Sequence, residues 1–178
     1  MADADRRFGR LGPVDAVLLL AQAKAEDVAR RLADGDGVND LVLGCDSMLE
    51  FDGRAFGKPV DAAEAGQRWR AMRGKCGVLH TGHWLIDRRE SSFGGTGATF
   101  GATASTTVYF ADLSDAEIDA YVATGEPLHV AGAFTIDGLG GPYVERIEGD
   151  HHNVVGLSLP LLRTMLGEIS VTWTDLRG

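Results

Sequence analysis

The segment 41–59 constrains the fold of this chain more than any other part of the sequence. An apolar run at its start leads to Asp46, which predicts a buried β-strand that delivers a carboxylate to the end of a sheet. Asp52 and Gly53 then form a hairpin signal, because both tolerate the positive φ angles of a type I′ turn. The turn would bring Lys58 back towards Asp46. A carboxylate and an ammonium group at the end of an α/β sheet suit metal-assisted chemistry on phosphate.

The positive charges of this chain are mostly arginines. Of its 17 Lys and Arg residues only three are lysines, Lys24, Lys58 and Lys75. Lysine is a compact point charge whose pKa responds to burial, so it suits a phosphate contact or a proton-transfer role. We therefore regard the lysines as candidate functional residues. The alternative is that three lysines are present by chance.

The bulk composition is that of a globular protein. A chain of 178 residues with 44% hydrophobic and 24% charged residues predicts one domain with a continuous core. Its apolar runs are too short to span a bilayer, and its N-terminal residues lack the apolar stretch of a signal peptide. We expect a cytoplasmic protein with no membrane partner, in which Cys45 and Cys76 are reduced thiols.

The net charge of −9 argues against nucleic acid as a partner, since nucleic-acid binding relies on a basic surface. An anionic small substrate is still compatible with this charge. It would require a local cationic pocket, or a divalent metal ion held by carboxylates.

Pro13 opens a predicted amphipathic helix that ends at the glycines of segment 35–37. Its apolar stripe consists of Val14, Val17, Leu18, Ala21, Ala25, Val28 and Leu32. Lys24 follows Ala21 by three residues and therefore lies along the buried stripe. Such a lysine either has a functional partner or extends to solvent from the edge of the stripe, and the sequence favours neither.

Two further helices begin at capping-box patterns, Asp61 with Glu64 and Ser114 with Glu117. The first runs past Trp69, and each ends at a glycine. Strands are predicted over 78–86 and 106–110, with a mobile, glycine-rich hairpin connection over 88–105 between them. The alternation of strands and helices predicts an α/β fold with a mixed sheet flanked by helices.

The segment 131–141 concentrates glycines and small residues around Asp137, which would let the backbone approach a ligand closely. It is either a wall of an active site or an ordinary turn, with equal weight. His151 and His152 are interpreted as loop residues rather than a metal site. Neither His80 nor His83 has an evident partner, and Glu126 is interpreted as a solvated charge.

Seven short motifs occur in a fixed order from Pro13 to the last predicted helix. They are Ala23-Lys24-Ala25, Gly44-Cys45-Asp46-Ser47, Gly57-Lys58-Pro59, Gly74-Lys75, Thr81-Gly82, Ala131-Gly132-Ala133-Phe134, and Gly149-Asp150 with Asn153-Val154-Val155-Gly156-Leu157. Together they resemble the Maf family of nucleoside triphosphate pyrophosphatases, first named for effects on septum formation. The resemblance implies a Maf/ITPase-like α/β domain over 13–178.

This resemblance implies hydrolysis between the α and β phosphates of a nucleoside triphosphate with a pyrimidine or modified base, and Mg²⁺ or Mn²⁺ as cofactor. Asp46 would be the catalytic carboxylate and the metal ligand, while Lys24 and Lys58 would contact phosphate. A homodimer is the expected assembly.

Base selection in the family is the work of two positions that correspond here to Ser47 and Asp137. Where pyrimidine-specific members usually carry Thr and Gln, this chain has Ser and Asp. The hydroxyl is retained, but an amide is replaced by a carboxylate that only accepts hydrogen bonds.

Residues 1–12 resemble nothing in the family, and the resemblance implies that its N-terminal phosphate-binding loop is lacking. Arg6, Arg7 and Arg10 could replace that loop, although a basic tail is the preferred interpretation of 1–12. The alternative function is therefore a non-catalytic nucleotide-binding regulator of cell division, or a truncated and inactive relative.

Overall fold

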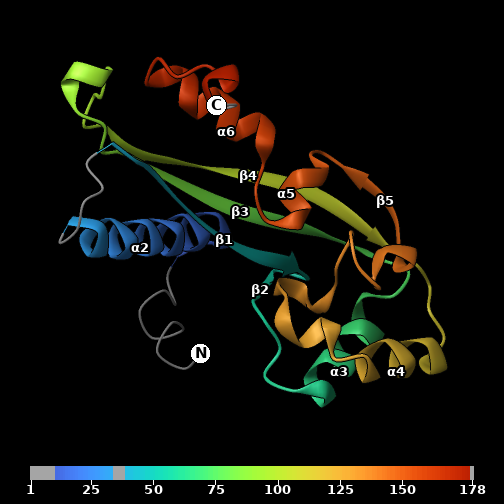
Figure 1. The fold of residues 1–178 in the computed structure, drawn as a ribbon. Helices are drawn as coiled ribbons and strands as arrows, with labels where there is room; N and C mark the ends of the chain where they lie inside the picture. Colours follow the sequence, from blue (N-terminus) through green and yellow to red (C-terminus); the bar gives the residue numbers. More distant parts are fainter. Residues whose placement is uncertain (1–10, 34–38, 177–178) are drawn as a thin grey trace. The chain divides into compact units, whose positions relative to one another are not determined.

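The computed structural model describes residues 11–33 and 39–176. Their helices and strands are α2 (Pro13–Ala33), β1 (Leu41–Phe51), β2 (Arg54–Phe56), α3 (Ala62–Met72), β3 (Cys76–Asp87), η1 (Ser91–Phe93), β4 (Thr99–Phe110), α4 (Asp115–Ala123), η2 (Glu126–His129), η3 (Ala131–Ala133), η4 (Gly141–Tyr143), β5 (Val144–Glu148), α5 (His151–Val155), α6 (Leu159–Glu168) and η5 (Trp173–Leu176). The strands form one sheet in the order β2-β1-β3-β4-β5, as Figure 1 shows, so the predicted α/β class is confirmed. The arginines of segment 1–10 and the predicted helix stop at 35–37 lie outside the described residues.

The chain divides into two compact units. The first contains the described parts of Met1–Asp46, Thr81–Ala104 and Leu157–Gly178, and the second contains Ser47–His80 and Ser105–Gly156. Strands β1, β3 and β4 each contribute residues to both units. The single domain over 13–178 stays a prediction.

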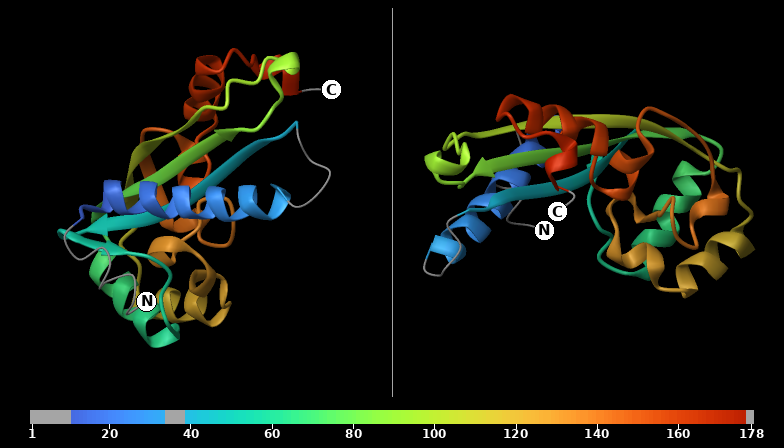
Figure 2. Two further views of the ribbon diagram at one scale, coloured as in Figure 1. Left: turned by 90° about the vertical axis from the view of Figure 1, so that its left-hand side faces the viewer. Right: turned by 45° about the horizontal axis from the view of Figure 1, so that its top comes forward.

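In the first unit, helix α2 lies beside strand β1 and packs against glycines (Figure 2). Gly44 in β1, Gly82 in β3 and Gly101 in β4 face the helix, and a Cβ atom at any of them would overlap with α2. At Gly44 and Gly82 the overlap is with the helix backbone, which cannot rotate aside as a side chain can. Glycine at these positions is therefore what permits the close approach of α2.

The buried stripe of α2 is narrower than its sequence pattern predicts. Ala16, together with Val17, Ala21 and Ala25 of the predicted stripe, is at most 5% exposed. By contrast Val14, Val28 and Leu32, which the pattern also assigned to the stripe, are exposed. Small side chains lie where the helix meets the strand glycines, since larger ones would hold the helix away from the sheet.

A second cluster of apolar residues in the first unit lies around helix α6. Its buried members are Leu85, Met165, Leu166, Ile169 and Val171. The backbone N–H of Ser158, the N-cap of α6, donates to Nε2 of His83 at 2.8 Å. The proton of His83 is therefore on Nδ1, which donates to the Thr81 carbonyl at 2.9 Å. His83 thus fastens the start of α6 to β3, a role its sequence context did not predict.

The connection between β3 and β4 is shorter and better fixed than the sequence pattern predicts. Thr99 to Ser105 belong to β4, so only residues 88–98 form the connection. The buried carboxylate of Asp87 accepts hydrogen bonds from Arg89 and from the backbone N–H and hydroxyl of Thr96. The prediction of a mobile connection over 88–105 was wrong. Its polar composition does not show that residues 99–105 pair as part of β4, or that the buried carboxylate of Asp87 binds the rest of the connection.

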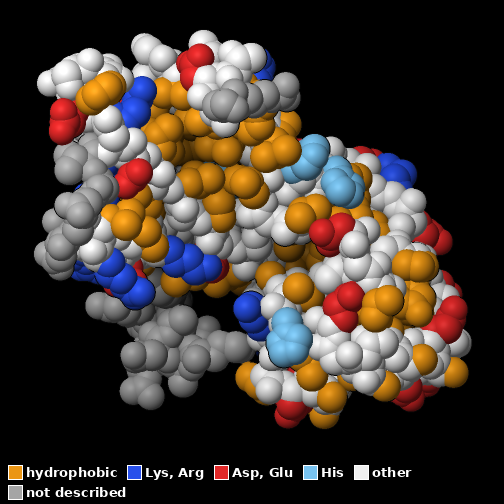
Figure 3. Space-filling model, viewed as in Figure 1, with side chains coloured by type: hydrophobic (Ala, Val, Ile, Leu, Met, Phe, Trp, Pro, Cys, Tyr) orange, Lys and Arg blue, Asp and Glu red, His pale blue; other side chains and the backbone are white. Residues whose placement is uncertain are grey.

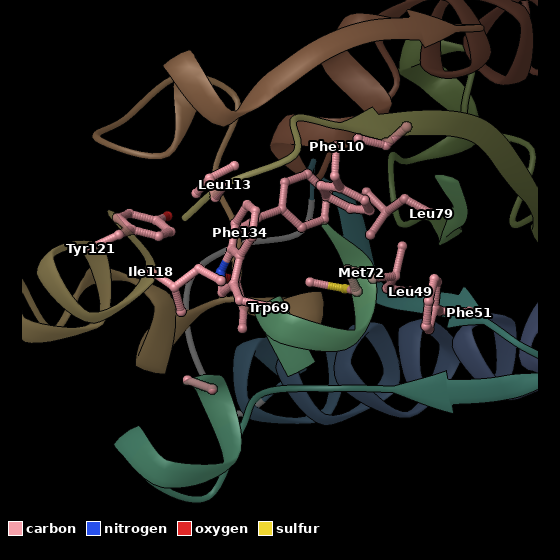
Figure 4. Packing of buried hydrophobic residues seen from close by; sticks show 13 residues of the cluster. Leu49, Phe51, Trp69, Met72, Leu79, Phe110, Leu113, Ile118, Tyr121 and Phe134 are labelled. Carbon is pink, nitrogen blue, oxygen red and sulfur yellow. The ribbon is translucent and has the colours of Figure 1, made fainter. Parts of the chain in front are cut away.

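The core of the second unit is built around Trp69 of α3. Its ring makes edge-to-face contacts with Phe110, Tyr121 and Tyr143, with centroids 5.6 to 6.0 Å apart. Its indole N–H donates to the carbonyl of Ala133 at 2.7 Å. Figure 4 shows Trp69 and Phe134 among the other buried side chains of this core. Helix α3 is thereby tied to the glycine-rich segment 131–141.

Most local signals of the second unit are confirmed. Asp52 and Gly53 have φ angles of 48° and 71°, and they join antiparallel strands in which Phe51 pairs with Arg54. Ser114 and Glu117 form a reciprocal capping box at α4. At α3 the N-cap Asp61 accepts from the backbone N–H of Glu64, but the Glu64 side chain accepts from the backbone N–H of Val60 instead of Asp61, so the predicted capping box forms only in part.

The two adjacent histidines lie on a short helix, α5, and not in a loop as expected. Asp150 is its N-cap and accepts from the backbone N–H of His152. The side chains of His151 and His152 are exposed. The sequence pattern missed this helix because it has only five residues.

Candidate active site

Lys24 and Asp46 form an ion pair in the first unit. The ammonium group of Lys24 donates to Oδ1 of Asp46 and, at 2.9 Å, to the carbonyl of Cys45. The Lys24 side chain is 56% exposed and that of Asp46 is 20% exposed. Figure 3 shows Lys and Arg side chains gathered over α2. Of the two alternatives for Lys24, the structure shows a side chain at the edge of the stripe that nevertheless has a specific carboxylate partner.

Asp46 lies within β1 rather than at its end, so the prediction that the strand terminates there was wrong. Val42 and Gly44 are buried before it, and Leu49 and Phe51 are buried after it. The parity of the buried positions therefore changes around Asp46, and the residues at this change, 45–48, are only partly buried although the strand continues. Because Asp46 follows Gly44 by two residues, it shares the face of β1 that α2 covers.

Cys45 is a half-buried neighbour of this pair. Burial raises the pKa of its thiol to about 11, and the nearby charge of Lys24 opposes this only in part. Since the thiolate is the nucleophilic form of cysteine, this shift disfavours Cys45 as a nucleophile at neutral pH. Its contribution to the site is its backbone carbonyl, which accepts from Lys24.

Lys58 lies in the second unit, two residues after the last pair of the β1–β2 hairpin. The carbonyl of the preceding residue, Gly57, accepts from Nη1 of Arg68 at 2.6 Å and from the backbone N–H of Gly132 at 3.2 Å. Lys58 itself is exposed and has no ion pair with any described residue. The backbone before Lys58 is thus fixed by α3 and by the glycine-rich segment, while its ammonium group is free to contact a ligand.

Glu126 organises the segment that carries Asp137. Its carboxylate accepts from the hydroxyls of Thr135 and Tyr121 at 2.6 and 3.0 Å, and from the backbone N–H groups of Leu139 and Gly140 at 2.9 and 3.0 Å. Burial acts to raise the pKa of Glu126, but these hydrogen bonds outweigh it and hold the pKa below its ordinary value. The interpretation of Glu126 as a solvated charge was wrong, because the sequence does not show that four donors converge on it.

The structure brings together two of the predicted site residues, Lys24 and Asp46. The other predicted residues, Ser47, Lys58 and Asp137, belong to the second unit. Ser47 is half-buried in β1, and Asp137 is exposed between the segments that Glu126 holds. Their roles stay predictions.

A polar array on three strands of the second unit was missed by the sequence analysis. Nε2 of His80 lies 3.0 Å from a carboxylate oxygen of Glu50, and Nδ1 lies 2.8 Å from the hydroxyl of Ser105. His80 is buried, and so are its neighbours in β3 from Leu79 to His83. No local pattern therefore marks this array, because only the order of the strands shows that Glu50 and Ser105 lie beside His80.

A divalent metal ion fits the observed carboxylate. Within the described residues no three His, Cys, Asp or Glu side chains gather as a metal cage. Mg²⁺ does not require one, since it is commonly held by one or two carboxylates together with substrate phosphates and water. Asp46 is sufficiently exposed to supply one such ligand.

The fold and the Lys24–Asp46 pair define an α/β protein with a candidate site for chemistry on phosphate. The family described as Maf-like protein matches residues 2–169, and the chain belongs to this family.

Three relatives are named nucleoside triphosphate pyrophosphatase. That of Salinispora tropica is 59% identical over 159 residues, which cover 89% of this chain and 68% of the relative. That of Leifsonia xyli subsp. xyli is 52% identical over 176 residues, which cover 99% and 80% of the two chains. That of Streptomyces avermitilis is 52% identical over 164 residues, covering 92% and 75%. None of the described helices is long and apolar enough to cross a bilayer.

Proposed function

We propose that this chain is a nucleoside triphosphate pyrophosphatase, which uses water to convert a nucleoside triphosphate into a nucleoside monophosphate and pyrophosphate. Relatives with this name are 52–59% identical to this chain, and the aligned residues cover 89–99% of it. The observation that carries the proposal is the Lys24–Asp46 pair, which joins a carboxylate that can act on water to a cation that suits phosphate.

In the proposed mechanism Asp46 orients the attacking water and accepts its proton, while the water oxygen forms a bond to the α phosphorus. The bond between that phosphorus and the oxygen bridging to the β phosphate breaks, and pyrophosphate leaves with the bonding electrons. Lys24 holds the Asp46 carboxylate in position and also contacts the substrate phosphates. The ammonium group of Lys58 contacts the departing phosphates, whose oxygens gain negative charge.

Asp46 would also hold a divalent cation, Mg²⁺ or Mn²⁺, together with oxygens of the substrate phosphates. When bound, the cation supplies positive charge that neutralises the phosphate oxygens. The ion pair with Lys24 uses Oδ1 of Asp46, and the side chain is 20% exposed, which supports this assignment.

We assign base selection to Ser47 and Asp137, with pyrimidine or modified nucleotides as the substrate class. An ionised Asp137 only accepts hydrogen bonds, so it favours a base that presents an N–H group to it. The fixation of its segment by Glu126 supports a role in selection, since a discriminating carboxylate must be held in place. A homodimer is the assembly we propose, which light scattering in solution tests.

The proposal is tested by pyrophosphate release from a panel of nucleoside triphosphates with Mg²⁺ or Mn²⁺. We expect Asp46→Asn to abolish release, whereas Asp27→Asn, which removes an ion-paired carboxylate from the same helix as Lys24, keeps it. Full activity of Asp46→Asn would refute the assignment of the catalytic carboxylate. Nucleotide binding by calorimetry without release from any nucleotide would instead favour the non-catalytic regulator.

A further inference from the structure

A cavity of about 150 Å³ lies between the β1–β2 hairpin and helix α3 of the second unit. Its apolar walls are Phe51 and Phe56 from the hairpin and Ala71 and Met72 from the helix. An apolar cavity of about this volume can hold one benzene ring. None of these wall residues belongs to the site assigned above.

Positive charge surrounds this cavity. Arg54 and Arg68 line it, with their guanidinium carbons 5.6 and 4.9 Å from the centre of the Phe56 ring. The ammonium group of Lys75 lies 5.4 Å from the centre of the Phe51 ring. Neither Arg54 nor Lys75 has an ion pair with a described residue, and one lining residue, Asp52, is negative. Arg68 is paired with Glu64, so Arg54 is the lining cation that is left without an ion pair to a described residue.

The side chain of Arg68 is only 5% exposed, and two of its three guanidinium nitrogens donate to described residues. Its Nη1 donates to the carbonyl of Gly57 and its Nη2 to Glu64, each at 2.6 Å. Its Nε–H is buried and has no acceptor among the described residues. Because this atom is closed off from solvent, Arg68 lines the cavity as a guanidinium group that Gly57 and Glu64 hold in place.

We infer that this cavity binds a monocyclic aromatic anion, such as an aryl phosphate or an aryl carboxylate. The ring lies between the hairpin phenylalanines and Met72, and the anionic group pairs with Arg54 at the exposed rim. This inference concerns a second site and does not depend on the proposed pyrophosphatase activity.

Binding is tested with phenyl phosphate by NMR of methionine methyl groups. The chain has four methionines, and Met72 lines the cavity whereas Met165 packs in the first unit. We expect a saturable shift of the Met72 signal, assigned through Met72→Leu, and none for Met165. No shift of Met72, or a shift confined to other methionines, would overturn the inference. An equal response to phenol or to inorganic phosphate alone would also overturn it, because binding would then not require both the aromatic ring and the negative charge.

Variants test the proposed contacts. Arg54→Gln removes an exposed charge, so we expect the fold to persist and phenyl phosphate to bind about tenfold more weakly or worse. Ala71→Phe fills the cavity and should abolish the response. Arg70→Gln is the matched control, since Arg70 lies on the same helix but pairs with Asp119. Unchanged affinity in Arg54→Gln and Ala71→Phe, both shown to be folded by circular dichroism, would place the ligand elsewhere.

Discussion

Lys24 is the residue whose substitution reports most directly on the candidate active site. Its ammonium group has two oxygen partners, the carboxylate of Asp46 and the carbonyl of Cys45. The side chain is more than half exposed, so the fold does not depend on burying it. Changing it separates the chemistry of the site from the stability of the unit.

We predict that Lys24→Met lowers kcat for nucleoside triphosphate hydrolysis by about 100-fold, because it removes a positioned cation from the phosphate site. Lys24→Arg should recover part of this loss, since the charge is kept but the planar guanidinium differs in shape. Steady-state assays give both values, with Arg30→Met on the same helix as control. Wild-type kcat in Lys24→Met would exclude Lys24 from the site.

Asp87 makes the stability of the first unit dependent on pH. Hydrogen bonds from Arg89, and then from Thr96, hold the pKa of this buried carboxyl far below its usual range despite the opposing effect of burial. Because the pKa is lowered on folding, the stabilisation is complete above the ordinary value of about 3.9 and is lost as pH falls below it.

We therefore predict that Asp87→Asn lowers the free energy of unfolding by roughly 2–4 kcal/mol at pH 7. The difference from wild type should narrow as pH falls below about 4. Urea denaturation at several pH values measures both effects. A difference that stays constant down to pH 3 would mean that folding does not lower the pKa of Asp87.

At the scale of elements, the packing of α2 on strand glycines determines where Lys24 lies. The helix itself follows from its sequence periodicity, but the depth of its packing follows from Gly44, Gly82 and Gly101 on separate strands. No local pattern marks these glycines as a surface for a helix.

Gly44→Ala should push α2 away from β1, since the new Cβ would meet the backbone of α2. We expect a loss of roughly 1–3 kcal/mol in the free energy of unfolding, together with reduced activity from the displaced Lys24. Gly167→Ala, in helix α6 with open space around it, is the control and should be neutral or stabilising. Thermal denaturation measures the loss of stability, and the pyrophosphate assay measures the loss of activity. Equal stability of Gly44→Ala and Gly167→Ala would contradict a close packing of α2 on Gly44.

For the whole molecule, we predict that a chelator abolishes hydrolysis without altering thermal unfolding. Among the described residues no group of three potential metal ligands holds the fold together, so the cation would be needed only with substrate. Circular dichroism melts with and without EDTA, beside activity assays, test this. A fall in the melting temperature on chelation would indicate a structural metal ion.

Much of the fold was predictable because its signals are local. The Asp52–Gly53 turn, the cap at Ser114 and the helix from Pro13 each depend on neighbours within a few residues. Features that join distant segments were not predictable. The donors to Glu126 come from residues up to 14 positions away, and the array around His80 joins three strands.

The sequence by itself determined the α/β class, the local turns and caps, and the choice of Asp46 and Lys24 as candidates. Only the tertiary structure decided that these two side chains meet, that Asp46 lies within β1, and that four donors hold Glu126. The physical reason is range: backbone propensity and capping act over a few residues, whereas ion pairs and buried hydrogen bonds depend on which distant segments pack together.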